Sequence, residues 1–157
     1  VGVGSDENQV FYEANPTANG LNAPMSQDFK IEGSMKEVAS KAHNSNEPEL
    51  ILKLNTSSVQ DKATIEALDN FFKENKNWNA FKSDCADAAK IAIKKGGFDP
   101  GKAFLISTPQ ELAQDLYENN IKYSGNLIEE VKGDWKNYRE GVGAVNGLIK
   151  KNIPGGK

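Results

Sequence analysis

The sequence predicts an α+β domain in which a small antiparallel sheet packs against helices. Strand-like segments rich in β-branched and aromatic residues gather in the first third of the chain, and amphipathic helical patterns follow them. Such segregation favours α+β over a doubly wound parallel sheet, in which strands and helices alternate. A chain of 157 residues, 38% of them hydrophobic, can bury one core, so we expect a single domain over residues 1–157.

The chain is expected to open with a β-hairpin. Residues 1–4 and 9–14 are strand-like segments separated by four polar residues, which are expected to form the turn. The next segment, residues 15–24, contains two prolines and is expected to be a loop. Two further strands are predicted: residues 28–32, where polar and apolar side chains alternate, and residues 49–54, an apolar run typical of a central strand.

Four helices are predicted, over about residues 35–42, 58–75, 83–97 and 108–118. The second carries an apolar stripe at helical spacing that must bury against the sheet, made of Ile65, Leu68, Phe71 and Phe72. Ser34 is expected to cap the first helix, a Gly-Gly pair to end the third, and Thr-Pro-Gln-Glu to begin the fourth.

Two segments complete the expected architecture. Residues 103–107 predict a short strand before the fourth helix. Residues 126–151 are amphipathic and expected to be mostly helical. We therefore divide the single domain into a core, residues 1–120, and a helical C-terminal extension, residues 121–157.

Composition excludes several classes of function. The net charge is −3, the lysines are dispersed among acids, and Arg139 is the only arginine, so no nucleic-acid interface is expected. No apolar run reaches eighteen residues, so no membrane span is expected. One cysteine allows no internal disulfide, which fits a cytoplasmic protein or one secreted by a route that avoids the periplasm. No signal peptide is visible, and a start without methionine suggests a piece of a longer chain.

The single cysteine, Cys85, is the candidate nucleophile. Ser83 is expected to cap the third helix, which puts Cys85 in its first turn. Free amide groups and the helix dipole there favour an anion, so we expect them to lower the pKa of the thiol from about 8.5 and to help hold an oxyanion. Asp84 and Asp87 oppose thiolate formation if they lie close. The alternative is a buried structural cysteine on the alanine-rich face of the helix.

Two segments resemble the permuted NlpC-type papain-like cysteine hydrolases. Residues 1–4 (Val-Gly-Val-Gly) and 10–14 (Val-Phe-Tyr-Glu-Ala) resemble the family's strand after the catalytic His and the strand that follows it. The expected His would immediately precede Val1. Residues 81–85 (Phe-Lys-Ser-Asp-Cys) resemble the family's Asn-Cys motif, with Asp where Asn is usual. The order of segments from residue 54 to residue 112 also resembles toxin-like C-terminal domains of Rhs-type polymorphic proteins.

The resemblance implies a permuted papain-like fold and a division of catalytic roles. Cys85 would be the nucleophile, a His preceding Val1 the base, and Glu13 the residue that orients it. The implied activity is hydrolysis of an amide bond in peptide or peptidoglycan, without a cofactor, by a secreted or delivered antibacterial effector. A catalytically silent module that binds an immunity or carrier protein is one alternative. A lipid acyl hydrolase or transferase is another.

Three further residues are weighed against that site. His43, the only histidine, is expected to be an exposed residue at the end of the first helix rather than the base. One His and one Cys cannot supply a zinc shell, so no metal is expected. Trp78 and Phe81 flank the cysteine helix and are expected to close the edge of the core rather than line a substrate groove.

Overall fold

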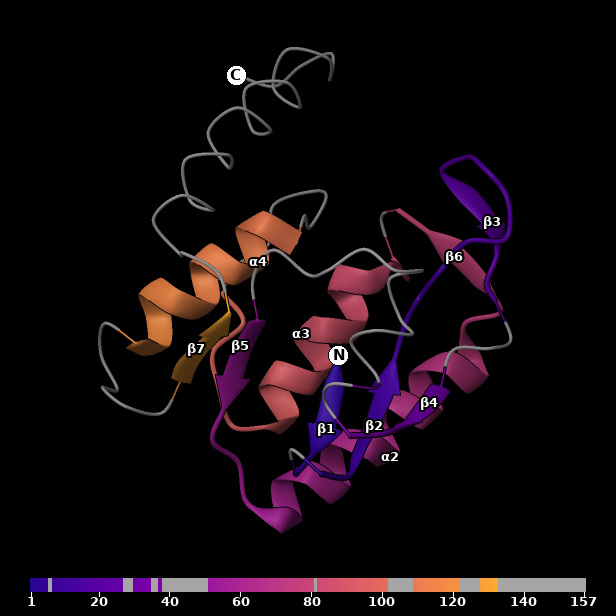
Figure 1. The fold of residues 1–157 in the computed structure, drawn as a ribbon. Helices are drawn as coiled ribbons and strands as arrows, with labels where there is room; N and C mark the ends of the chain where they lie inside the picture. Colours follow the sequence, from indigo (N-terminus) through magenta and orange to yellow (C-terminus); the bar gives the residue numbers. More distant parts are fainter. Residues whose placement is uncertain are drawn as a thin grey trace, which may run out of the picture.

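The computed structural model describes residues 1–5, 7–26, 30–34, 37, 51–80, 82–101, 109–121 and 128–132 (Figure 1). Its strands are β1 (Gly2–Gly4), β2 (Gln9–Tyr12), β3 (Asn22–Pro24), β4 (Lys30–Gly33), β5 (Ile51–Leu54), β6 (Asn77–Asn79) and β7 (Ile128–Lys132). Its helices are α2 (Ser58–Glu74), α3 (Cys85–Lys95) and α4 (Pro109–Leu116), and a π-helical turn, η1 (Tyr117–Ile121), continues α4. Small antiparallel sheets and helices thus form an α+β fold, as predicted.

The predicted N-terminal hairpin is present. β1 and β2 pair antiparallel with Val3 opposite Val10, and β4 pairs with the other edge of β2, giving the sheet order β1-β2-β4. Gly4 ends β1 with a φ of 125°, where a Cβ would collide with the carbonyl oxygen of Asn8. The tight turn therefore requires glycine at this position.

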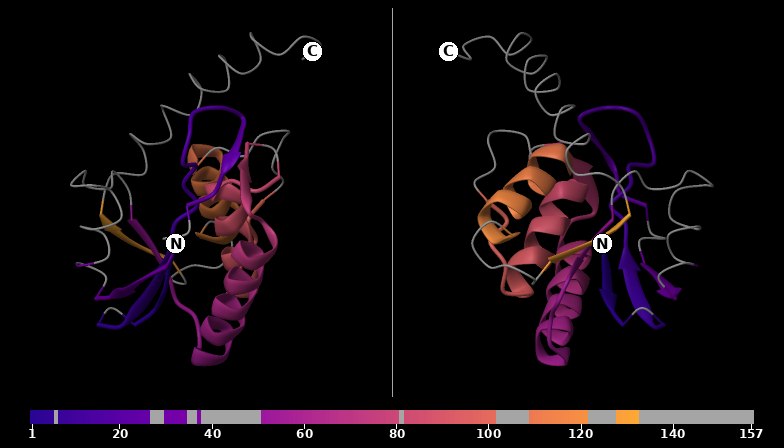
Figure 2. Two further views of the ribbon diagram at one scale, coloured as in Figure 1. Left: turned by 90° about the vertical axis from the view of Figure 1, so that its right-hand side faces the viewer. Right: turned by 60° about the vertical axis from the view of Figure 1, so that its left-hand side comes forward.

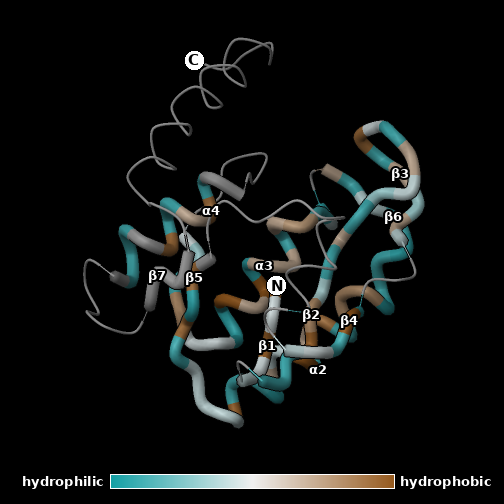
Figure 3. Tube along the Cα trace, viewed as in Figure 1, coloured by the Kyte–Doolittle hydropathy of each residue, from teal (hydrophilic) through white to brown (hydrophobic). Residues whose placement is uncertain are grey.

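Helix α2 forms where the apolar stripe predicted it. Ser57 is its N-cap, and Ser57 and Gln60 exchange the reciprocal hydrogen bonds of a capping box. Leu68, Phe71 and Phe72 are buried along one face. Figure 3 shows hydrophobic and hydrophilic positions alternating along α2 and α3, as expected of helices with one face on a core.

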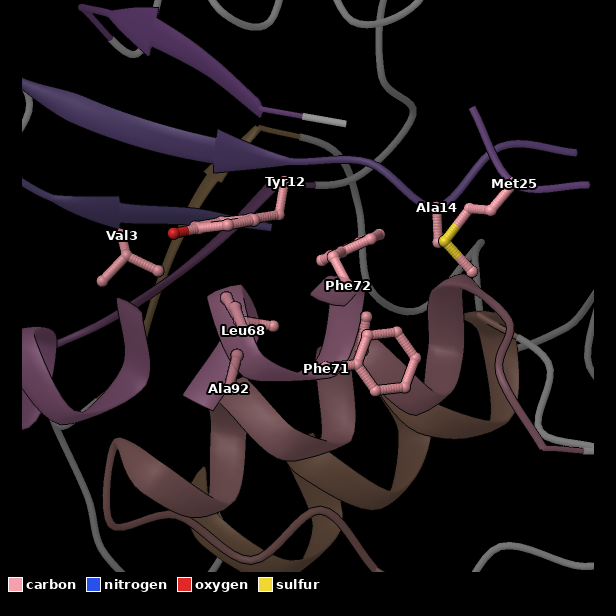
Figure 4. Close-up of a cluster of buried hydrophobic side chains, with 9 residues drawn as sticks. Val3, Tyr12, Ala14, Met25, Leu68, Phe71, Phe72 and Ala92 are labelled. Atoms are coloured by element: carbon pink, nitrogen blue, oxygen red, sulfur yellow. The ribbon is translucent and has the colours of Figure 1, made fainter. Parts of the chain in front are cut away.

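The main core lies between the three-stranded sheet and helices α2 and α3, which stand on one side of the sheet (Figure 2). Val3 and Tyr12 from the sheet meet Leu68 and Phe72 of α2 and Ala92 of α3 (Figure 4). The Tyr12 and Phe72 rings stack with centroids 5.9 Å apart. Burial of these apolar side chains holds the β1–β2 hairpin against α3.

A polar network closes the outer side of this core. The Tyr12 hydroxyl donates to Asp69 Oδ1 at 2.7 Å, and Lys30 Nζ pairs with the same carboxylate oxygen at 3.1 Å. Burial, followed by the bond to Asp69, raises the pKa of Tyr12 well above its usual range. The phenol therefore stays a donor to Asp69 at physiological pH and ties β2 to α2.

A second, smaller cluster joins α3, α4 and β5. Phe98 and Leu116 are buried there and pack against Leu52, Leu54 and Ile93. Asn120 in η1, itself buried, donates from Nδ2 to the carbonyl of Asp99 at 2.8 Å and accepts from the Asp99 N–H at 2.9 Å. These bonds pin the segment after α3 to the end of α4.

Four strands depart from the sequence prediction. β3 lies in the expected loop 15–24, and β6 lies in the polar connection between α2 and α3; the two pair with each other. Among the described residues β5 pairs only with β7, in a separate two-stranded sheet, rather than in the sheet of the N-terminal hairpin as a central strand. β7 falls inside residues 126–151, which were expected to be helical.

Several predicted elements lie outside the described residues. They include the strand at residues 103–107 and most of the helix at residues 35–42. At the start of that helix, Ser34 and Glu37 do form reciprocal hydrogen bonds: the Ser34 N–H donates to Glu37 Oε2 at 2.9 Å, and the Glu37 N–H to Ser34 Oγ at 3.4 Å. This is the capping arrangement expected of Ser34.

Candidate functional site

The start of α3 is fixed by two consecutive polar residues that are buried. Ser83 Oγ donates to the carbonyl of Asn77 at 2.8 Å, and the Ser83 N–H donates to the carbonyl of Asn79 at 3.0 Å. Asp84, not Ser83, is the N-cap: its Oδ1 accepts from the Asp87 N–H at 2.9 Å. Ser83 therefore anchors the approach to the helix, and the cap is shifted by one residue from the prediction.

Cys85 occupies the first helical position of α3, as predicted for the first turn. Residues at spacings of three, four and seven share a helix face, so Cys85 lies above Ala88 and Ala92. Both alanines are buried in the main core, whereas Cys85 is exposed. The residue is therefore at the rim of the core, which argues against a fully buried structural cysteine, while its thiol is largely removed from water.

The amino end of β1 meets this rim. Val1 and Tyr12 exchange backbone hydrogen bonds of 2.8 Å in both directions, which fixes the first residue at the end of the hairpin. The charges of Glu13 and Cys85 both act on the Val1 amino group, so each of the two side chains lies within electrostatic reach of Val1. Burial outweighs both and lowers the pKa of this amine to about 6.

Glu13 follows β2 directly and is half-buried. Its neighbours Tyr12 and Ala14 are both buried in the main core, so strand alternation turns Glu13 to the other face. Glu13 and Cys85 are both close enough to the Val1 amino group for their charges to act on it.

The electrostatics of the thiol differ from the prediction. Desolvation, followed by the adjacent Asp84 carboxylate, raises the pKa of Cys85. The N–H groups of Ala86 and Cys85 and the Val1 amino group act in the opposite direction. The N–H groups at the start of the helix favour the thiolate. They lower the pKa of Cys85 by less than desolvation and the Asp84 charge together raise it. Cys85 at rest is therefore a thiol and needs a base.

Asp84 has a structural role that the sequence analysis did not predict. It is 6% exposed, and burial raises the pKa of its carboxyl, while the N–H of Asp87 lowers it. The sequence carried a signal for it, an acidic residue three positions before another at a helix start. Asp84 is the carboxylate with the largest effect on Cys85, whereas Asp87, also expected to oppose the thiolate, bonds to the Asp84 N–H.

The remaining candidates fall outside the site. Trp78 in β6 is half-buried and packs against the main core, the role expected of it. His43 and Phe81 lie outside the described residues. Among the residues that the structure describes, no group of three or more His, Cys, Asp or Glu side chains is arranged to hold a metal ion. Within the same part of the chain, no helix has the length and apolarity needed to cross a membrane.

The function of this site has to be inferred from its own residues. No protein-family model, no curated protein and no solved structure matches the chain. The candidate site therefore consists of Cys85 at the start of α3, Glu13 directly after β2 and Val1, on whose amino group both charges act.

Proposed function

We propose that this domain is a cysteine hydrolase that cleaves an amide bond in peptide or peptidoglycan. The observation that supports the proposal is an exposed cysteine at a helix N-terminus whose charge, like that of Glu13, acts on the Val1 amino group at the end of the hairpin. A nucleophile, a position for a base and a residue to orient that base are the parts a thiol hydrolase needs.

The register of the hairpin indicates where the base would come from. β1 and β2 pair Val1 with Tyr12, so in a chain extended on the amino side of Val1 the added residue would stand opposite Glu13. Directly opposite residues of an antiparallel pair have neighbouring side chains on the same face. A histidine there would stand beside Glu13 on the face turned away from the core, so its ring would reach Cys85 only around the end of the hairpin at Val1.

The chemistry then follows in two steps. The base removes the Cys85 proton, and the thiolate attacks the substrate carbonyl to form a C–S bond. The Cys85 N–H at the start of α3 stabilises the oxyanion, because the N–H groups of Asp87 and Ala88 are already bonded to Asp84. Collapse of the tetrahedral species expels the amine, which takes the proton from the base and leaves a thioester. Water, activated by the same base, hydrolyses the thioester and restores the thiol.

The raised pKa of Cys85 supports a second candidate function, that of a catalytically silent binding module. A papain-like module whose thiol stays protonated can act as a silent surface that binds an immunity or carrier protein. The hydrolase is preferred because Cys85 is exposed at a helix N-terminus, whereas binding alone does not require a thiol there. Delivery of the domain as a secreted antibacterial effector is part of the proposal.

The test is cleavage of purified peptidoglycan by a chain extended on the amino side of Val1 with its natural sequence. Release of soluble fragments is measured for that chain, for Cys85→Ala in it, and for the 157-residue chain alone. We expect release only from the unsubstituted extended chain, since loss of the base costs orders of magnitude in rate. Full activity of the Cys85→Ala variant would end the cysteine-hydrolase hypothesis. An inactive extended chain that still binds a protein partner would favour the silent module.

A further inference from the structure

Residues 17–21 form an exposed loop between β2 and β3. The base of the loop is closed, because the N–H and the hydroxyl of Thr17 donate to the Pro24 carbonyl at 2.9 and 3.0 Å. At its tip, Asn19 and Gly20 are exposed, and no hydrogen bond joins either of them to another residue that the structure describes. The fold thus holds the ends of the loop and leaves the tip without contacts that would restrain it.

The order of these two residues permits an intramolecular reaction. The backbone nitrogen that follows an asparagine can attack the side-chain amide carbon, and a Cβ on the following residue hinders its approach. Gly20 has no Cβ, and its φ is 137°, a value that L side chains rarely adopt. Around the place where a Cβ would stand, the nearest heavy atoms are the backbone oxygen and nitrogen of Asn22, at 3.8 and 4.0 Å. Both the residue type and the open space therefore leave the Gly20 nitrogen accessible.

Asn19 differs in this respect from the other asparagines of the described segments, none of which precedes a glycine. The closest comparison is Asn22 in β3, which pairs with Asn79 of β6. It is followed by Ala23, which is buried and carries a Cβ. Strand pairing and this side chain obstruct the same reaction at Asn22. The second Asn-Gly pair of the chain, residues 146–147, lies outside the described residues.

We propose that Asn19 is a site of spontaneous deamidation. The Gly20 nitrogen attacks Asn19 Cγ and loses its proton, a new C–N bond forms, and the side-chain nitrogen leaves as ammonia. Water then opens the cyclic succinimide at either carbonyl and yields aspartate or isoaspartate. The loop gains a carboxylate, and isoaspartate also adds a methylene to the main chain. The inference does not depend on Cys85 or on the proposed hydrolysis.

The test compares the folded chain with the same chain unfolded in guanidinium chloride, both incubated at physiological pH. Mass spectrometry of the tryptic fragment 1–30 locates the conversion of amide to acid at each asparagine, and an isoaspartyl methyltransferase labels the isoaspartate. Because the tip is not restrained, Asn19 in the folded chain should react at a rate within about threefold of the unfolded rate. Asn22, in the same fragment, should react about tenfold more slowly than Asn19 or less.

Two neighbouring variants separate the chemistry from general effects on the loop. Gly20→Ala places a Cβ beside the attacking nitrogen and should slow deamidation of Asn19 about tenfold or more. Ala18→Gly is the matched control: it leaves that nitrogen unchanged, so the rate should stay within error of the unsubstituted chain. A folded rate at Asn19 tenfold or more below the unfolded rate would overturn the inference. So would equal rates at Asn19 and Asn22, or an unchanged rate in Gly20→Ala.

Discussion

At the scale of single residues, the site depends on which charges lie beside Cys85. The thiol is exposed, but its surroundings and Asp84 make it a weaker acid than a free cysteine. The charge of Glu13 acts on the Val1 amino group, where it favours a cation. The Asp84 charge thus disfavours the thiolate, whereas the Glu13 charge favours a protonated base.

Glu13→Gln tests the second of these roles in the extended chain. Without the carboxylate, the imidazolium formed during thiol deprotonation loses its partner, so we expect the rate of peptidoglycan cleavage to fall by about ten- to a thousandfold. Substrate affinity should change little. The matched control is Glu7→Gln, because Glu7 lies exposed in the hairpin turn. Equal rates for Glu13→Gln and Glu7→Gln would remove Glu13 from the mechanism.

The position of Cys85 could be predicted from sequence, whereas the sign of its pKa shift could not. A polar cap followed by alanines at spacings of three, four and seven is a local pattern, and it places the residue at a helix start. The pKa depends on how much water reaches the sulfur and on where the Asp84 carboxylate is held. Both depend on Ser83 and its partner Asn77 from β6, a strand that sequence analysis missed.

At the scale of elements, long amphipathic patterns were predicted well and short strands were not. Helices α2, α3 and α4 begin close to their predicted cap signals because each carries several turns of consistent pattern. β3 and β6 are three residues each, Asn-Ala-Pro and Asn-Trp-Asn, which local propensity assigns to loops. Only their pairing with each other makes them strands. β7 was misassigned because an amphipathic period in a short segment does not separate helix from strand.

Helix α2 supports the site through its core face. Leu68 has no exposed surface and lies between the sheet and α3, so Leu68→Ala should lower the free energy of unfolding by about 2–5 kcal/mol. Val59 on the same helix is 77% exposed, and Val59→Ala should change it by less than about 0.5 kcal/mol. Urea unfolding followed by circular dichroism measures both. Similar midpoints for the two variants would contradict the assigned core.

The hairpin turn offers a second pair of variants. Gly4→Ala introduces a Cβ at a positive φ and against the Asn8 carbonyl, so we expect a loss of about 2 kcal/mol or more in unfolding free energy. Gly2→Ala in the same strand meets only the flexible end of Gln9, and its cost should stay below about 1 kcal/mol. Thermal melts of both variants measure the two losses in stability. A Gly4→Ala protein as stable as Gly2→Ala would show that the turn is not as tight as described.

At the scale of the whole molecule, stability should depend on pH through the Val1 amine of the 157-residue chain. The amine has a pKa of about 6 when folded and about 8 when unfolded. Between these values the unfolded state binds more protons, so stability should rise with pH, by an amount on the order of 2 kcal/mol from pH 6 to pH 8. Urea unfolding at several pH values measures the slope.

N-terminal acetylation provides the control for this pH effect. The acetylated chain cannot bind a proton at Val1, so its stability should change less over the same range. Equal slopes for the two forms would mean that the amine is not buried between the hairpin and α3.

The paired backbones of Val1 and Tyr12 also affect how the protein should be handled. Any segment fused to Val1 leaves the domain within electrostatic reach of Cys85, so it is tethered to the thiol at an effective concentration in about the millimolar range. An affinity tag of consecutive histidines placed there would supply imidazole to the sulfur, whatever residue the natural chain carries. Thiol reactivity measured on such a fusion would report the tag as much as the protein, so purification handles belong at the other end of the chain.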